Sequence, residues 1–169
     1  MRIELDVGEG ERLIPGLRDA LESLTRTDMR YLMANPRTPA LYCSGAACRV
    51  HPVRYQMEPP GAEHWASIPT VLAQGWGDCE DLACWRAAEL RLNGHPRAYA
   101  FPIELGTAPM VAGGPSVRLI HILVNRDGGC DFSQVEDPST VLGMPRIPLH
   151  VMLKAVRTEC EARVGRTWP

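Results

Sequence analysis

Cys79 occupies a position where a cysteine can act as a nucleophile. It lies in the stretch AQGWGDCEDLACWRAAELRLNGH, residues 73–95, directly before apolar residues that recur at helical spacing. Asp78 is a favoured N-cap residue, and Asp81 follows three residues later, so the sequence predicts a helix that begins at Cys79. The first turn of a helix stabilises a thiolate through its free N–H groups and its dipole. Asp78 and Glu80 oppose this effect, because nearby negative charge raises the pKa of a thiol.

A thiol with acidic neighbours needs an imidazole partner to become reactive. His121 is the best candidate, since it lies in the middle of the otherwise apolar stretch VRLIHILVN. If residues 117–125 and 130–136 form a hairpin, Asp137 emerges near this imidazole and can fix its tautomer. The spacing therefore predicts a catalytic triad of Cys79, His121 and Asp137.

Thiol attack on a carbonyl also needs donors for the developing oxyanion. The backbone N–H of Cys79 is one, and Gln74 or the indole of Trp76 could supply a second. Gly75 and Gly77 would let the backbone of a substrate approach the thiol.

Several blocks of the sequence resemble the transglutaminase-like cysteine protein superfamily, in particular its phage- and prophage-encoded members. The blocks are GWGDCEDLACWRAAELRLNGHPRAYAF, IHILVNRDGG and EDPSTVLGM, with PALYCSGA, EPPGAEHW and IPTVLAQG upstream. The resemblance covers about Pro39 to Met144 and implies a papain-like α+β core. It also implies that Cys79 is the nucleophile, His121 the general base and acid, and Asp137 the orienting carboxylate.

This interpretation predicts a cysteine hydrolase, either a peptidase or a deamidase, or an acyl-transferase that acts on amide bonds of a protein or peptide. A peptidase is favoured over a transglutaminase because the chain shows no calcium-loop pattern. The alternative is a non-catalytic phage structural or assembly protein that uses the same fold to bind capsid or tail proteins. Neither function requires a cofactor.

Each candidate residue also has a structural interpretation. Cys79 could be a buried packing residue, His121 a core histidine bonded to a carbonyl, and Asp137 the start of an Asp-Pro-Ser turn. Trp85 is expected in the core, and Trp76 fits either the core or a cleft.

The pattern of apolar residues and turn signals predicts one α+β domain over residues 1–169, with helices first and then an antiparallel sheet. A nucleophile-bearing helix would pack on this sheet. The expected elements are an N-terminal helix over residues 12–35, a family core over about 39–144 that includes strands at 97–105, 116–125 and 131–137, and a C-terminal helix over about 149–164.

The composition limits partners and location. The formal net charge of −2 argues against a nucleic-acid binder, and no apolar stretch is long enough for a membrane span. The N-terminus lacks the features of a signal peptide, which favours the bacterial cytoplasm or a virion. The six cysteines are then expected to be reduced, without a disulfide framework. Cys43, Cys48 and His51 lack a second close ligand pair, so no metal site is expected.

Overall fold

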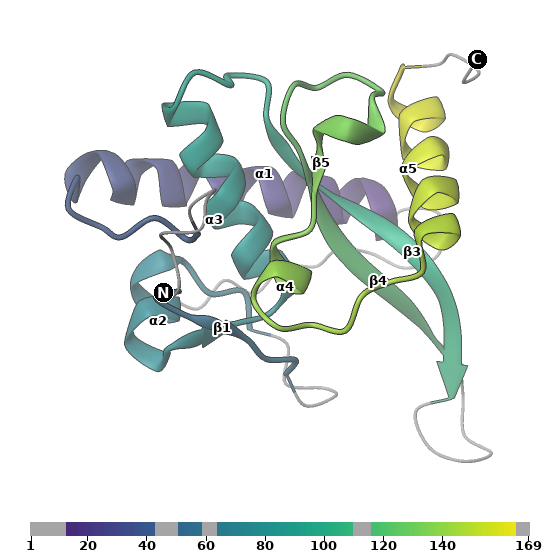
Figure 1. The fold of residues 1–169 in the computed structure, drawn as a ribbon, viewed down its shortest axis with the longest axis horizontal. Helices are drawn as coiled ribbons and strands as arrows, with labels where there is room; N and C mark the ends of the chain where they lie inside the picture. The colour runs from purple at the N-terminus through teal and green to yellow at the C-terminus, as the bar shows by residue number, and fades with distance from the viewer. Residues whose placement is uncertain (1–12, 43–50, 59–63, 110–115, 165–169) are drawn as a thin grey trace.

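Helix α3 (Cys79–Leu92) packs against helix α1 (Leu13–Ala34) and against an antiparallel sheet, which α1 also contacts (Figure 1). The computed structural model describes residues 13–42, 51–58, 64–109 and 116–164. Ala83 and Ala87 face this core, where their small side chains let α3 approach Leu21 and Leu24 of α1 closely. Both helices were predicted, and α1 ends where Asn35 bonds back to the carbonyl of Tyr31, directly before Pro36.

The sheet has the order β3-β4-β5. Strands β3 (Tyr99–Pro109) and β4 (Ser116–Asn125) form a long antiparallel hairpin in which Pro102 lies opposite Ile122. Alternate residues of β4 face opposite sides, so Ile122 and Val124 pack with α1 and α3 while Leu123 packs on the other face. The mixed α and β composition with an antiparallel sheet confirms the predicted α+β class.

The expected returning strand over residues 131–137 is shorter than predicted. Strand β5 is only Val135–Glu136, and the residues before it form a 3₁₀ helix, η2 (Phe132–Gln134). The cause is Asp131, whose carboxylate accepts hydrogen bonds from the backbone N–H of Ser133 at 2.9 Å and from its hydroxyl at 2.7 Å. This local cap replaces strand pairing, since a side-chain acceptor offers the backbone an alternative to the ladder.

Helix α5 (Leu149–Val164) has the predicted bounds and covers the face of the sheet opposite α3 (Figure 1). Val156 packs there with Phe101 and Leu123. The sheet therefore has helices on both faces, with the core divided between them.

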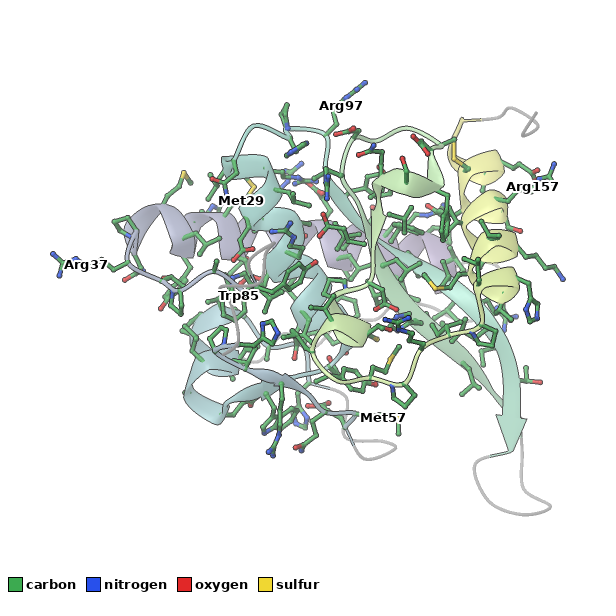
Figure 2. All side chains as sticks on the ribbon, in the orientation of Figure 1. Met29, Arg37, Met57, Trp85, Arg97 and Arg157 are labelled. Atoms are coloured by element: carbon green, nitrogen blue, oxygen red, sulfur yellow. A yellow bond between two sulfur atoms is a disulfide. The ribbon has the colours of Figure 1, made fainter. Side chains whose placement is uncertain are left out.

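A disulfide joins Cys130, in the turn after β4, to Cys160 on α5, and its yellow bond is visible beside this helix in Figure 2. The expectation that all cysteines are reduced is therefore wrong for this pair. The two residues are 30 positions apart in the sequence, and only the docking of α5 brings their Cα atoms to 5.6 Å. Cys79 and Cys84 are free thiols, and Cys43 and Cys48 lie outside the described residues.

Four short elements lie around the start of α3. Strand β1 (Arg54–Tyr55) pairs in parallel with β2 (Trp76–Gly77), and helix α2 (Ile68–Gln74) precedes β2. Helix α4 (Pro138–Val141) follows Asp137. A cluster of apolar side chains from these segments surrounds Trp85, which is fully buried as predicted and lies near the centre of the molecule (Figure 2).

Candidate active site

Cys79 is the first residue of α3, as the sequence predicts. Asp78 is the N-cap, and its backbone N–H donates to Asp81 Oδ2 at 3.4 Å within a capping box. Gly77, directly before the cap, is buried. A Cβ there would lie 3.2 Å from Leu82 Cδ2 and 3.2 Å from Val71 Cγ1. The absence of a side chain at Gly77 thus lets β2 pack against α2 and α3.

Cys79 packs against the apolar cluster that includes Ile122 and Val124 of β4. Strand β5 does not cover Ile122, since its pairing with β4 involves only Val124 and Asn125. The backbone of Ile122 acts to lower the pKa of the thiol, but burial and Glu80 raise this pKa by more.

His121, the residue before Ile122, forms a hydrogen bond with Asp137. The distance from His121 Nε2 to Asp137 Oδ1 is 3.1 Å, and both side chains are largely buried, with exposures of 4% and 10%. This bond occupies Nε2, so Nδ1 is the nitrogen that remains to exchange a proton. The structure thus brings together the two residues that the sequence predicted as partners.

Besides its bond to His121, Asp137 stabilises the start of helix α4. Its carboxylate caps α4, accepting from the backbone N–H of Thr140 at 3.1 Å and from its hydroxyl at 2.7 Å. Burial alone raises the pKa of Asp137, but the bonds from His121 and Thr140 outweigh it and the pKa is lowered. Asp137 is therefore an ionised partner for the imidazole as well as a helix cap.

The thiol of Cys79 bonds to Glu80. The distance from Sγ to Glu80 Oε2 is 3.3 Å, and no hydrogen bond joins Cys79 to His121 among the described residues. Burial raises the pKa of the thiol, and the charges of Glu80 and Asp78 raise it further. The resting state is a neutral thiol.

Three acidic residues of the first turn are buried together, which the sequence pattern did not predict. Asp78, Glu80 and Asp81 are 5%, 6% and 1% exposed. Asp81 accepts a bond from the backbone N–H of Ala66 at 2.7 Å, yet burial and the charge of Glu80 raise its pKa to about 8. Burial and the neighbouring carboxylates also raise the pKa of Asp78. Such a cluster disfavours a thiolate at Cys79.

Among the described residues, neither Gln74 nor Trp76 forms a hydrogen bond with the Cys79 thiol. Gln74 is exposed at the end of α2, and its Nε2 donates to the carbonyl of Trp76 at 2.7 Å. To serve as an oxyanion donor, the amide of Gln74 would have to leave this bond. Trp76 is half-buried in β2.

Tyr55 is a neighbour of the site that sequence reasoning did not select. It pairs with Gly77, and its backbone N–H donates to the carbonyl of Leu142 at 2.9 Å, just after α4. Burial raises the pKa of its phenol to about 12, and the negative forms of Cys79, Asp78, Glu80 and Asp137 contribute. No motif around Tyr55 in the sequence connects it with Cys79, because the pairing of β1 with β2 brings the two segments together only in the fold.

Two surface hollows lie away from Cys79. One, of about 450 Å³, is lined by Tyr31, Pro36, Leu72 and their neighbours, and a second, of about 530 Å³, adjoins it at Ser67 and Thr70. Within the described ranges, no three His, Cys, Asp or Glu side chains are arranged to hold a metal ion, and no helix is long and apolar enough to cross a membrane.

No protein-family model matches the sequence, and neither the curated proteins nor the solved structures include a match. The geometry of the chain itself is therefore the basis for its proposed function.

Proposed function

We propose that this chain is a cysteine hydrolase or acyl-transferase that acts on amide bonds of a protein or peptide, on a papain-like, transglutaminase-like core. Cys79 is the nucleophile, His121 the general base and acid, and Asp137 the orienting carboxylate. The observation that supports this most strongly is the 3.1 Å bond between His121 and Asp137. His121 directly precedes Ile122, which belongs to the apolar cluster against which Cys79 packs.

The chemistry follows the roles of these groups. His121 Nδ1 removes the thiol proton as the sulfur attacks the amide carbonyl carbon, and the carbonyl electrons move onto the oxygen. When the tetrahedral intermediate collapses, the C–N bond breaks and the imidazolium gives its proton to the leaving amine. Asp137 stabilises the imidazolium throughout. The product is an amine and a thioester on Cys79.

The second half of the reaction determines the class of enzyme. Water attack on the thioester makes the protein a peptidase or deamidase, and attack by an amine makes it an acyl-transferase. Hydrolysis is the favoured reaction because it needs only water as the second reactant.

The contact between Cys79 and Glu80 favours a second candidate function. A thiol that is bonded to a carboxylate at 3.3 Å and has a raised pKa is poorly prepared for attack. A phage structural or assembly protein that binds capsid or tail proteins would not need a reactive thiol. Either function is compatible with a location in a virion or in the cytoplasm of a bacterial host.

The pH dependence of iodoacetamide alkylation at Cys79 separates the two functions. Alkylation is followed by mass spectrometry with fragment ions that distinguish Cys79 from Cys84, in the wild type and in His121→Ala. An enzyme should show alkylation below the ordinary thiol pKa of about 8.5 that falls at least tenfold in His121→Ala.

His95→Ala is the matched control. His95 Nδ1 also lies 3.0 Å from an aspartate, Asp127, but this pair is at the opposite end of α3 from Cys79. Its substitution should leave the alkylation of Cys79 unchanged. If the wild type reacts only near pH 8.5 or above, and all three proteins behave alike, the enzymatic proposal is wrong and the binding protein is favoured.

A further inference from the structure

The proposed acyl transfer needs two donors for the oxyanion, and only one is evident at the nucleophile. The backbone N–H of Cys79, at the start of α3, has no partner within its helix. The amide of Gln74 already donates to the carbonyl of Trp76. A second donor must come from another element that faces the thiol.

Strand β1 is paired with β2, which ends two residues before Cys79. It lies alongside β2, with Tyr55 opposite Gly77 and the N–H of Gln56 bonded to the Gly77 carbonyl at 3.0 Å. On its other side, the backbone of Tyr55 bonds to Leu142. Tyr55 is thereby held between the segment that leads into Cys79 and the segment that follows Asp137.

The phenol of Tyr55 is suited to donate. Its backbone pairs with Gly77, two residues before Cys79, and bonds to Leu142, five residues after Asp137. Burial and the nearby negative groups raise the pKa of the phenol, which keeps the proton on the oxygen. Among the described residues, no hydrogen bond engages its hydroxyl. The side chain is half-buried, so a bound substrate can reach the hydroxyl.

We infer that Tyr55 is a further catalytic residue, whose hydroxyl donates a hydrogen bond to the oxyanion that forms when the Cys79 sulfur attacks a carbonyl. This inference rests on the proposed function. It assigns to Tyr55 the second donor position, for which the sequence had suggested Gln74 or Trp76.

Two reagents separate this role from a structural one. p-Nitrophenyl acetate acylates the thiol through a tetrahedral oxyanion and releases p-nitrophenolate, whereas iodoacetamide alkylates it by direct displacement of iodide, without an oxyanion. Tyr55→Phe should slow acylation of Cys79 by about tenfold to a hundredfold, while the alkylation rate stays within twofold of wild type.

Tyr31→Phe is the matched control. Tyr31 packs against the same apolar cluster as Tyr55 but lines the hollow near Pro36. Tyr31→Phe should alter neither the acylation nor the alkylation rate of Cys79. If circular dichroism shows that Tyr55→Phe is unfolded, Tyr55→Leu is measured in its place, with the same expectation.

The outcomes are distinct. Equal acylation rates in wild type and Tyr55→Phe overturn the inference and leave the proposed function in place. A parallel fall in both reactions also overturns it, because Tyr55 then acts on the thiol or on the fold. A wild type whose Cys79 shows no reactivity below the ordinary thiol pKa overturns the proposed function, and the inference with it.

Discussion

Arg86 and Glu136 form a bidentate ion pair, with 2.7 Å between Nε and Oε2 and 3.3 Å between Nη2 and Oε1. Arg86 lies on α3, two turns after Cys79, and Glu136 immediately precedes Asp137. The pair thus joins the helix that carries the thiol to strand β5, which ends directly before the orienting carboxylate of Asp137. Tyr42 adds a bond from its hydroxyl to Glu136 at 2.6 Å, and Arg126 forms a further ion pair with the same carboxylate.

Glu136→Gln should therefore weaken the fold in a pH-dependent manner. Although burial opposes it, bonding from Arg86, Tyr42 and Arg126 lowers the pKa of Glu136 from 4.5 to about 2. Because the pKa of Glu136 is lower in the folded chain than in the unfolded chain, its ionised form stabilises the fold at pH values above about 4.5. This stabilisation is lost as the pH falls from about 4.5 to about 2. We expect a loss of about 2 to 3 kcal/mol at pH 7, measured by urea denaturation.

The difference in the free energy of unfolding between Glu136→Gln and the wild type should shrink as the pH falls from about 4.5 to about 2. Glu161→Gln, an exposed glutamate on α5, is the control and should cost less than about 0.5 kcal/mol. A loss of stability in Glu136→Gln that is the same at every pH between 2 and 7 would contradict the prediction that the ionised form of Glu136 stabilises the fold.

Glu80→Gln should make Cys79 more reactive. The Glu80 carboxylate accepts a hydrogen bond from the Cys79 thiol, and its negative charge raises the pKa of that thiol. A neutral amide at this position removes the charge and with it this part of the rise in pKa. We expect alkylation by iodoacetamide at pH 7 to accelerate by about tenfold. Glu161→Gln serves again as the control, and an unchanged or slower rate in Glu80→Gln would show that burial alone sets the reactivity.

Asp137 can be tested in its two roles separately. Asp137→Asn keeps an acceptor for the N–H of Thr140 but loses the charge that orients His121, whereas Asp137→Ala loses both. We expect Asp137→Ala, but not Asp137→Asn, to lose about 1 kcal/mol of stability because the cap of α4 is missing. Both variants should slow alkylation of Cys79 at pH 6 by tenfold or more. Full reactivity in Asp137→Asn would mean that Asp137 serves only as a cap.

The start of α3 and the position of His121 were predictable because both depend on local signals. Asp78 with Asp81 marks a helix start, and an apolar run of alternating faces marks β4. The meeting of His121 and Asp137 followed from the expected hairpin, even though η2 replaced most of the returning strand. Residues brought in by distant chain segments were not predictable, and Tyr55 and the Cys130–Cys160 disulfide are examples. The sequence identified Glu80 as a neighbour of the thiol but could not show that the Glu80 carboxylate would be buried and bonded to it.

Asp28 gives a prediction outside the site. It is fully buried on α1 and accepts a bond from the N–H of Ile68 at 3.0 Å, and burial raises its pKa from 3.8 to about 7. A raised carboxyl pKa means that the folded state binds the proton more tightly, so stability falls as the pH rises from about 4 to about 7. Asp28→Asn should remove this fall, which amounts to about 3 to 4 kcal/mol.

Chemical denaturation at pH 4 and pH 8 measures the effect of Asp28→Asn. Asp19→Asn, on the same helix, serves as the control and should follow the wild type. A variant at Asp28 that keeps the wild-type pH dependence would mean that Asp28 is not the responsible group.

The disulfide has a consequence for how the chain responds to proteolysis. Cys130 and Cys160 close a covalent ring that contains β5, Asp137 and α4, while Cys79 and His121 lie outside it. Arg146 is exposed in the segment between α4 and α5, where trypsin can cut. The two pieces would remain joined, so a nicked chain should run as one species without reductant and as two with it. A single break in this connection therefore does not separate α5 from the segment that contains β5, Asp137 and α4.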